Sequence, residues 1–478
     1  MLLKHFFIEK IAHSSYILAG KETCAVIDPQ RDVDLYLQEA RSLGVRITHI
    51  FQTHLHADFL SGHMDLQAKT GAKIYVPASA NCDFDHIPVA EGDVVKLEDM
   101  DLAVLETPGH TPEHVSYVVT DHSRGDNPIG VFVGDTLFVG DVGRPDLFPD
   151  MAVELAGKLY HSLHDKLMKL PDYVEVYPAH GAGSLCGRSM GAKWLSTIGY
   201  ERLYNPTLQI QDKRDFIHSL SNDMPPAPDH FSRCSEINRQ GPKKMDDLSV
   251  LKEVTIEDFT DLIDNPDVVI LDVRPYASFA SLHIPGAWHI DLHGNFPTFT
   301  GWVLPIDKDI LMVADGHDDV LQANLWMRRV GMDRAVGYLQ GSMVAWVTKG
   351  KKIEDILMIS AEDLHERMMG EHDFVLVDVR APLEFADSHI TGAINIPAPD
   401  LRERFVELDP DQPTVLVCSS GNRSSLAGSI LKQHGFKQVY NLAGGMTGYS
   451  AAGFAKECKV CVNPHGSRYT AGTYQSTI

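Results

Sequence analysis

Residues 53–59 read Thr53-His54-Leu55-His56-Ala57-Asp58-Phe59, and they follow an apolar run, Ile47 to Phe51, that is typical of a buried strand. This stretch places two imidazoles and a carboxylate in H-x-H-x-D spacing, and such side chains bind zinc and iron. Three later apolar stretches also end in a metal-capable side chain, at His110, Asp135 and His180. A metal site on one rim of a sheet needs polar side chains at several strand ends, so the sequence predicts a metal centre.

The stretch resembles the metal-binding motif of the metallo-β-lactamase superfamily, and the likeness covers the first half of the chain. The superfamily motif is H-x-H-x-D-H, but Phe59 stands where the last His is expected. A phenyl ring cannot bind a metal, which argues against a complete second metal site and against a two-metal hydrolase such as glyoxalase II. The resemblance implies an α/β fold, a metallo-β-lactamase αββα sandwich, over residues 1–245.

Within this superfamily the chain looks most like the persulfide dioxygenases. The segments that carry the likeness are THLHAD at 53–58, TPGHTPEH at 107–114 and GRPDL at 143–147. Those enzymes hold one Fe(II) by two His and one Asp, which implies His54, His110 and Asp135 as the ligands here. Two His and one carboxylate leave coordination positions open for O2 and for a substrate.

The other polar residues of the motif are open to two interpretations. In the first, His56, Asp58 and His180 lie beside the ligands and orient them or a bound water. In the second, His56 is itself a ligand and completes a three-His set that holds zinc. The expected cofactor is therefore Fe(II), one per chain, with zinc as the alternative.

Arg144 lies in the GRPDL segment and is a candidate substrate contact. Its guanidinium could hold a carboxylate of a thiol cofactor such as glutathione. The alternative is a salt bridge within the loop, to Asp141 or Asp146. The sequence leaves both interpretations open.

The seven cysteines do not form a disulfide framework pattern. An odd, scattered set in a long chain is typical of cytosolic thiols. Cys24 lies in an apolar run and Cys186 closely follows His180, so each is either a buried thiol or an accessory thiol. In the accessory interpretation Cys186 accepts or passes on sulfur, or protects the site. Cys458 and Cys461 form a C-x-x-C pair that could serve as a redox pair or a metal clip.

The second half of the chain contains an internal repeat. Asp272-Val273-Arg274 and Asp378-Val379-Arg380 each end a short apolar run, and each is followed at the same spacing by a His, His283 or His389. The copies lie about 105 residues apart, which is too long for a solenoid repeat and fits a duplicated α/β domain with a parallel sheet. The expected joint between them is Lys349-Gly350-Lys351-Lys352.

The second copy carries a cysteine at a strand end. An apolar strand, Thr414 to Val417, leads into Cys418, and a helix is expected after the loop. Backbone N–H groups and a helix N-terminus stabilise a thiolate there and would hold a persulfide anion. The residues of this persulfide loop are Ser419, Ser420, Gly421, Asn422 and Ser424. Arg423 is expected to add positive charge for an anionic donor or acceptor such as thiosulfate or sulfite.

This second copy closely resembles a rhodanese domain, and the C-x-x-G-x-R loop is shorter by one residue than that of rhodanese-like phosphatases. The shorter loop favours sulfur over phosphate. The first copy keeps the framework but has Asp315, Asp318 and Asp319 near the matching strand end and no Cys. We therefore expect an inactive rhodanese-like domain at 246–352, acting as a spacer, docking surface or dimer contact, and an active rhodanese domain at 353–478.

The composition excludes several classes of function. The 478 residues are 44% hydrophobic and 22% charged, as in ordinary globular proteins. A net charge of -23 gives no electrostatic reason to bind nucleic acid or an anionic membrane. No apolar run is long enough to span a bilayer, and Lys4, Glu9 and Lys10 break the pattern of a signal peptide. We expect a cytoplasmic protein with neither nucleic-acid nor membrane partners, and a homo-oligomer.

Together these features predict a persulfide dioxygenase fused to a sulfurtransferase. The expected substrates are a low-molecular-weight thiol persulfide and O2, which give sulfite, and Cys418 then joins sulfite to a sulfane sulfur to give thiosulfate. One alternative is a zinc-dependent, glyoxalase II-like thioester hydrolase with an accessory rhodanese. Another is a sulfur carrier or sensor in which Cys418 only holds a persulfide for a partner.

Overall fold

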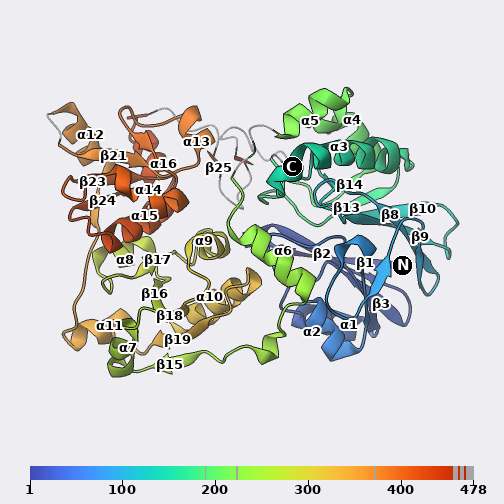
Figure 1. The fold of residues 1–478 in the computed structure, drawn as a ribbon, viewed down its shortest axis with the longest axis horizontal. Coiled ribbons are helices and arrows are strands. Elements are labelled where there is room, and N and C mark those ends of the chain that lie inside the picture. The colour runs from blue at the N-terminus through green and yellow to red at the C-terminus, as the bar shows by residue number, and fades with distance from the viewer. Residues whose placement is uncertain are drawn as a thin grey trace, which may run out of the picture. The chain divides into compact units, whose positions relative to one another are not determined.

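The computed structural model describes residues 1–188, 190–221, 224, 226–370 and 373–455, and the backbone of 461–462 and 468–469. The chain divides into two compact units (Figure 1). The first comprises Met1–Leu248 with Arg328–Gly331, and the second comprises Ser249–Met327 with Met332–Ile478. The boundary expected between the two repeats, at 352–353, stays a prediction, since both repeats fall in the second unit.

The first unit is built on two sheets. One sheet has the strand order β1(Leu2–Ile8), β2(His13–Ala19), β3(Thr23–Ile27), β4(Arg46–Phe51), β5(Lys73–Pro77), β6(Ile87–Val89). The other has the order β14(Ser196–Thr197), β13(Glu175–Pro178), β10(Pro128–Gly134), β9(Val115–Asp121), β8(Met100–Glu106), β7(Val94–Leu97). Strand β2 is buried along its whole length because both faces of its sheet are covered.

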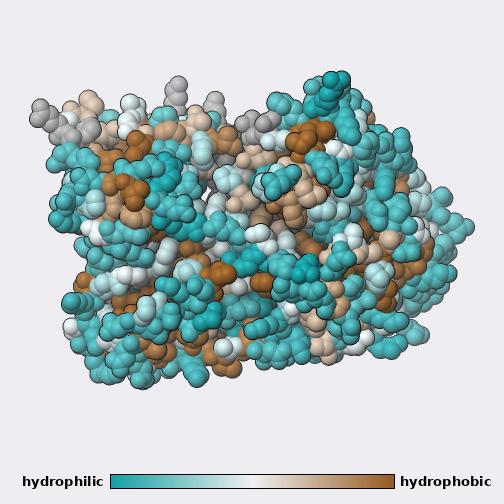
Figure 2. Space-filling view, viewed as in Figure 1, coloured by the Kyte–Doolittle hydropathy of each residue, from teal (hydrophilic) through white to brown (hydrophobic). Residues whose placement is uncertain are grey.

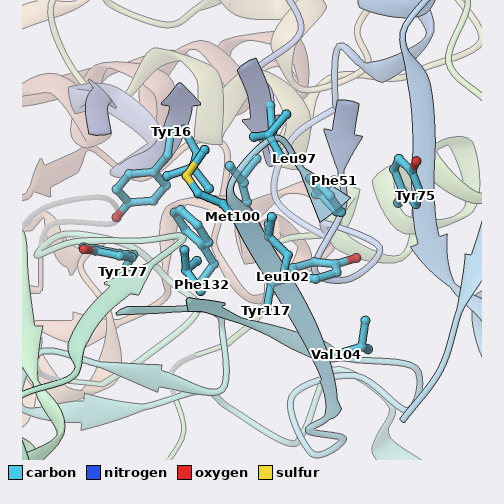
Figure 3. Close-up of a cluster of buried hydrophobic side chains, with 14 of the residues drawn as sticks. Tyr16, Phe51, Tyr75, Leu97, Met100, Leu102, Val104, Tyr117, Phe132 and Tyr177 are labelled. Atoms are coloured by element: carbon cyan, nitrogen blue, oxygen red, sulfur yellow. The ribbon is translucent and has the colours of Figure 1, made fainter. Parts of the chain in front are cut away.

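The two sheets pack face to face over an apolar core. Figure 3 shows part of it, with Tyr16 and Phe51 from the first sheet near Leu102, Tyr117 and Phe132 from the second. Burying an aliphatic or aromatic side chain of this size contributes about 1.5–3 kcal/mol, so this interface is a main source of the unit's stability.

Helices cover the outer faces of both sheets. Helices α1(Asp34–Leu43) and α2(His63–Thr70) bury Tyr36, Ala40 and Leu66 against the first sheet. Helices α3(Ala152–His161) and α5(Lys213–Ser221) bury Leu159 and Phe216 against the second. The predicted αββα sandwich is confirmed. The unit also contains β11(Leu137–Phe138), β12(Asp141–Val142), α4(Ile198–Tyr204) and α6(His230–Gln240).

The second unit holds two parallel sheets with one common topology. The first repeat has the order β15(Lys252–Val254), β19(Ala335–Leu339), β18(Asp309–Val313), β16(Val268–Asp272), β17(Trp288–His289). The second has the order β20(Leu357–Ile359), β24(Val439–Leu442), β23(Thr414–Val417), β21(Val375–Asp378), β22(Ile394–Asn395). Matching strand orders confirm the duplicated, parallel α/β architecture that the sequence predicted.

The helices of the repeats also correspond. The first repeat contains α7(Ile256–Ile263), α8(Tyr276–Ser281), α9(Phe296–Val303), α10(His317–Arg329) and α11(Ser342–Thr348). The second contains α12(Ala361–Met369), α13(Pro382–Asp387), α14(Leu401–Arg404), α15(Asn422–Gln433) and α16(Gly445–Ala451). In each repeat the Asp-Val-Arg segment forms a buried ion pair, Arg274 with Asp272 and Arg380 with Asp378, both at 2.6 Å.

The face drawn in Figure 2 is mostly hydrophilic, with hydrophobic side chains scattered among the polar ones. None of the helices in the described part of the chain combines the length and the apolar character that crossing a bilayer requires. A short hairpin, β25(Cys461–Val462) with β26(Arg468–Tyr469), follows the second repeat.

Candidate functional site

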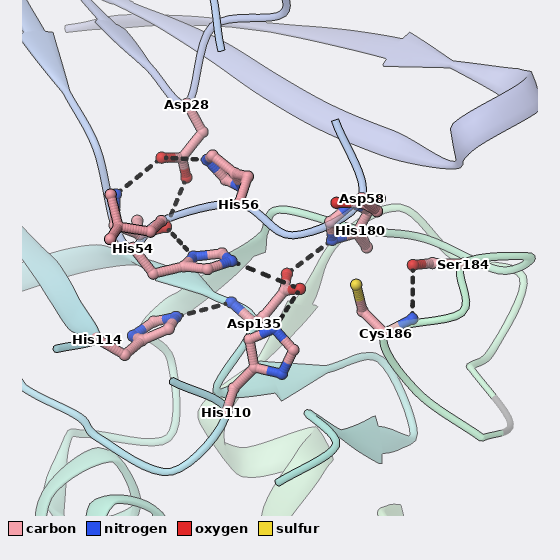
Figure 4. A network of polar contacts seen from close by, with 12 residues as sticks. Asp28, His54, His56, Asp58, His110, His114, Asp135, His180, Ser184 and Cys186 are labelled. Atoms are coloured by element: carbon pink, nitrogen blue, oxygen red, sulfur yellow. Dashed lines mark hydrogen bonds and ion pairs between the residues drawn. The ribbon is translucent and has the colours of Figure 1, made fainter. Parts of the chain in front are cut away.

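Three buried side chains from distant segments converge in the first unit (Figure 4). His54 follows β4, His110 lies between β8 and β9, and Asp135 directly follows β10. Their ligand atoms lie within 4.8 Å of one another. The Asp135 Oδ2 atom is 3.3 Å from His110 Nε2 and 3.8 Å from His54 Nε2. The fold thus brings together the three residues that the resemblance implied as ligands.

These three residues fit a metal ion. Within the described part of the chain, His54 Nε2, His110 Nε2 and Asp135 Oδ2 are buried and form no hydrogen bond. A buried polar atom without a partner costs about 1–3 kcal/mol, so three such atoms facing one point indicate a cation between them. The donor set, two imidazole nitrogens and a carboxylate, suits iron or zinc.

The opposite atoms of the same side chains are held in place. The His110 Nδ1 atom is 2.9 Å from the Arg144 carbonyl oxygen, and the His54 Nδ1 atom is 2.9 Å from Thr53 Oγ1. These contacts fix the ring orientations, so both Nε2 atoms point to the centre. Burial lowers the pKa of His54 and of His110, which keeps both rings neutral and able to bind a metal.

His180 connects two carboxylates beside this centre. Its Nδ1 atom lies 2.7 Å from Asp135 Oδ1, and its Nε2 atom lies 2.8 Å from Asp58 Oδ2. Although burial opposes the charged ring, the two carboxylates raise the pKa of His180 well above its ordinary value. Burial likewise raises the pKa of Asp135, but His180 outweighs it and holds that pKa below its ordinary value. His180 therefore keeps Asp135 ionised and oriented, and Asp58 holds the other side of the His180 ring.

His56 lies beside the three ligands but is not part of the group of ligand atoms within 4.8 Å of one another. Its Nε2 atom lies 3.2 Å from Asp28 Oδ1, and Asp28 also accepts hydrogen bonds from the backbone N–H and hydroxyl of Thr53. This arrangement favours the two-His-one-Asp set over the three-His set.

Phe59 is fully buried, with its ring 4.0 Å from that of His13 and 4.5 Å from that of His56. Aromatic packing thus occupies the position of the missing His.

Two contributors to the site were absent from the sequence prediction. Asp28 directly follows β3, so it stands after an apolar strand like the other site residues, which is a signal that the sequence contains. His114 is the second His of the TPGHTPEH segment, and its Nε2 atom accepts a hydrogen bond from the Asp135 backbone N–H at 2.9 Å. Both residues position ligands through contacts that only the folded chain creates.

Arg144 forms the loop salt bridge. The side chain is buried, and its Nε and Nη2 atoms each donate to the Asp146 carboxylate at 2.7 Å. Its Nη1 atom donates to the Leu185 carbonyl at 3.1 Å. The guanidinium thereby joins the GRPDL loop to the segment that contains Cys186.

The candidate accessory thiols are buried. Burial, with the charges of Asp58 and Asp135, raises the pKa of Cys186 well above its ordinary value. Cys186 forms a second potential ligand group with Asp58 and His180. Burial raises the pKa of Cys24 to about 12. Both thiols are therefore protonated at neutral pH. Cys458 and the Cys461 side chain lie outside the described residues.

A cavity of about 310 Å³ lies beside the metal-binding motif. Leu55 and Ala57, which flank His56, line it together with Thr111, which follows His110. Phe148 and Phe231 add aromatic walls. The cavity has the size and apolar lining of a site for a small organic molecule.

Cys418 lies at the predicted turn between β23 and α15. Its Sγ atom receives hydrogen bonds from the Gly421 backbone N–H at 3.1 Å and from the Ser424 hydroxyl at 3.2 Å. Such donors stabilise a sulfur anion. Ser419, Ser420 and Asn422 line a cavity at the same loop. The loop thus supplies both the donors that face the Cys418 sulfur and one wall of this cavity.

Arg423 has a different partner from the one expected. Its two terminal nitrogens donate to the Glu384 carboxylate at 2.6 and 2.9 Å, and Nη2 also contacts Ser419 Oγ at 2.7 Å. The Glu384 side chain is fully buried and that of Arg423 is 10% exposed. Glu384 of α13 thus balances the guanidinium charge, and Arg423 links the Cys418 loop to that helix.

Replacing Glu384 by Gln should destabilise the second unit by about 3 kcal/mol, because it leaves the Arg423 charge buried without its counter-ion. Urea unfolding of the full chain measures the loss. The Glu407→Gln variant is the matched control, because Glu407 pairs with Arg404 and both side chains are over 40% exposed. This control substitution should lower the free energy of unfolding by less than about 1 kcal/mol. Equal effects of the two substitutions would show that the Glu384 pair has no structural role.

Replacing Gly421 by Ala should reduce sulfur transfer at least about tenfold. The residue has φ 112°, and a Cβ there would lie 2.9 Å from the Tyr276 ring. Such a conformation is strained for any other residue, and the N–H that faces Cys418 would move. Gly316→Ala is the control, because its Cβ has 3.8 Å of clearance. Full transfer activity in Gly421→Ala would contradict this account of the loop.

Comparisons with known proteins agree with both halves of the chain. Residues 9–180 match the model of the metallo-beta-lactamase superfamily. Residues 255–349 and 360–452 each match the model of the rhodanese-like domain. A metallo-beta-lactamase from Staphylococcus aureus has a similar crystal structure, with a TM-score of 0.63 and 32% identity. That match covers 71% of this chain and 98% of the other, so it extends beyond the first unit.

Curated relatives match the first half. The mitochondrial persulfide dioxygenase ETHE1 of Bos taurus is 32% identical over 219 residues, which are 44% of this chain and 77% of that protein. The hydroxyacylglutathione hydrolase of Maricaulis maris is 40% identical over 164 residues, which are 33% of this chain and 57% of that protein. The match to the dioxygenase thus covers more of both chains than the match to the hydrolase.

Proposed function

The chain belongs to the metallo-β-lactamase superfamily, is related to the persulfide dioxygenases, and carries two rhodanese-like domains. We propose that it oxidises thiol persulfides to sulfite and converts sulfite to thiosulfate. The observation that carries the proposal is the set of three buried ligand atoms on His54, His110 and Asp135, which lie within 4.8 Å of one another and form no hydrogen bond in the described part of the chain. The Cys418 loop, in which two donors face one sulfur, supports the second step.

The proposed cofactor is one Fe(II) held by His54, His110 and Asp135. Bound there, Fe(II) would supply open coordination positions for O2 and the persulfide and would mediate electron transfer from the sulfane sulfur to O2. The chain's own residues prepare this centre: Asp28 and His114 position the motif and Asp135, and His180 keeps the Asp135 carboxylate ionised. The apolar cavity beside Leu55 and Ala57 would hold the thiol carrier and exclude water.

The proposed oxidation is balanced by O2 and water. One persulfide RSSH, one O2 and one water give the thiol RSH, sulfite and two protons. The sulfane sulfur is oxidised and O2 is reduced, so no further oxidant is needed. The thiol carrier is released from the apolar cavity as RSH.

The proposed transfer occurs at Cys418 without any external oxidant. The Cys418 thiolate attacks the outer sulfur of a second persulfide, and the S–S bond of that persulfide breaks. The proton of the persulfide moves to the departing thiolate, which leaves as RSH. The lone pair of the sulfite sulfur then attacks the outer sulfur of the Cys418 persulfide. The S–S bond to Cys418 breaks, thiosulfate leaves, and the thiolate returns to the donors from Gly421 and Ser424.

Metal analysis separates this proposal from a zinc thioester hydrolase. The protein reconstituted with Fe(II) should bind one iron per chain and should not cleave a glutathione thioester. Two zinc ions per chain, together with thioester cleavage, would overturn the proposal. Phe59 is the structural reason for the expected result, because its buried ring stands where a ligand of the second metal would be needed.

A further inference from the structure

The first rhodanese repeat lines the cavity at Cys418. This cavity of about 190 Å³ is bounded by Ser419, Ser420 and Asn422 of the second repeat. Its other wall comes from the first repeat, with Asp291, His293 and Asn295. Both repeats belong to one compact unit. The repeat without a cysteine therefore forms part of the cavity beside the loop that follows Cys418.

This wall is held firmly in place. The Asp291 carboxylate accepts hydrogen bonds from the backbone N–H of His293 at 2.9 Å and of Tyr276 at 3.0 Å. The His289 backbone N–H donates to Ser429 of helix α15 at 3.1 Å. Gly294 lies so close to the loop that a Cβ there would be 3.0 Å from Asn422 Nδ2. The segment from 289 to 295 is thus fixed against the helix that follows Cys418.

The cavity needs a group that recognises an anion. Both thiosulfate and sulfite are anions, but the guanidinium of Arg423 is balanced by Glu384, and Ser419, Ser420 and Asn422 are neutral. Asp291 adds a carboxylate to the lining, although each of its oxygens accepts a hydrogen bond from a backbone N–H. Among the described residues that line this cavity, His293 is the side chain other than Arg423 that can carry a positive charge. Its side chain is exposed at the cavity, where it is accessible to a small anion.

We propose that the first repeat completes the sulfur-transfer site and that His293 binds the oxyanion end of sulfite or thiosulfate. An imidazole N–H donates to a sulfonate oxygen, and the bond is stronger when the ring is charged. The N-terminus of α15 attracts the same anion from the second repeat. This inference rests on the proposed transfer activity and gives the first repeat a role beyond that of a spacer.

The test is steady-state sulfur transfer from thiosulfate to cyanide by the full chain. Cys418 takes the outer sulfur, sulfite leaves, and cyanide then removes that sulfur as thiocyanate. His293→Ala should raise the KM for thiosulfate about tenfold and change kcat less than about twofold, because it removes binding common to ground and transition states. His317→Ala is the matched control, since His317 is an exposed His of the same repeat that does not line this cavity.

Two further measurements complete the test. His293→Lys should recover most of the lost affinity, because it restores a cationic donor. In a Cys418→Ser background, sulfite should bind about tenfold more weakly when His293 is also replaced by Ala, as measured by titration calorimetry. An unchanged KM in His293→Ala, or a fall in kcat alone, overturns the inference and leaves the transfer activity standing. Absence of transfer in the wild-type chain would instead overturn the proposed function.

Discussion

The His110→Ala protein should lose oxygen uptake with a thiol persulfide by at least about a hundredfold, together with most of its bound iron. His110 supplies one of the three buried atoms that face the metal position, and its ring is fixed by the Arg144 carbonyl. Without this nitrogen the site keeps one imidazole and one carboxylate. An oxygen electrode and elemental analysis of the reconstituted protein measure the two losses.

The matched control for this prediction is His122→Ala. His122 belongs to the same unit, but its side chain is 42% exposed. Its ion-pair partners within the described part of the chain are Asp101 and Asp126, which lie outside the metal site. Its replacement should leave iron content and oxygen uptake unchanged. If His110→Ala retained wild-type uptake, the two-His-one-Asp site would not be the oxygenase, and the carrier or sensor interpretation would gain support.

The Cys418→Ser protein should lose sulfur transfer by at least about a thousandfold and keep its oxygen uptake. A serine hydroxyl keeps the size of the side chain but cannot form a persulfide. When persulfide and O2 are supplied, the Cys418→Ser protein should accumulate sulfite, whereas the wild-type chain should release thiosulfate. Chromatographic measurement of both anions over the reaction shows the shift.

Cys82→Ser is the control for that substitution, because Cys82 is a half-buried thiol of the first unit. Its products should match those of the wild-type chain. Continued thiosulfate formation by Cys418→Ser would contradict the proposed division of labour, since sulfite would then acquire its second sulfur without the loop cysteine.

Local patterns in the sequence were sufficient to predict a metal centre and the repeat, whereas the choice of His54, His110 and Asp135 as ligands came from the resemblance to the persulfide dioxygenases. His54, His110 and Asp135 each follow a short apolar run, and the ends of neighbouring strands meet at one rim of a sheet. The two Asp-Val-Arg segments predicted matching parallel sheets because each ends a short apolar run and is followed by a His at the same spacing. In these cases neighbouring residues carry most of the information.

Contacts between distant segments could not be predicted in the same way. Glu384 lies 39 residues from Arg423, so the sequence showed a cation in the loop but not the carboxylate that balances it. Arg144 had two candidate acidic partners within its loop, and side-chain packing decided for Asp146. The role of His293 depends on how one repeat packs on the helix of the other, which no local pattern encodes.

The most direct test of the account is oxygen consumption by the Fe(II)-loaded full chain supplied with glutathione persulfide, with sulfite and thiosulfate measured in the same sample. The account predicts one O2 consumed for each sulfane sulfur oxidised, with thiosulfate as the main product while persulfide remains. No oxygen consumption with any thiol persulfide, together with cleavage of a glutathione thioester by the same protein, would contradict it.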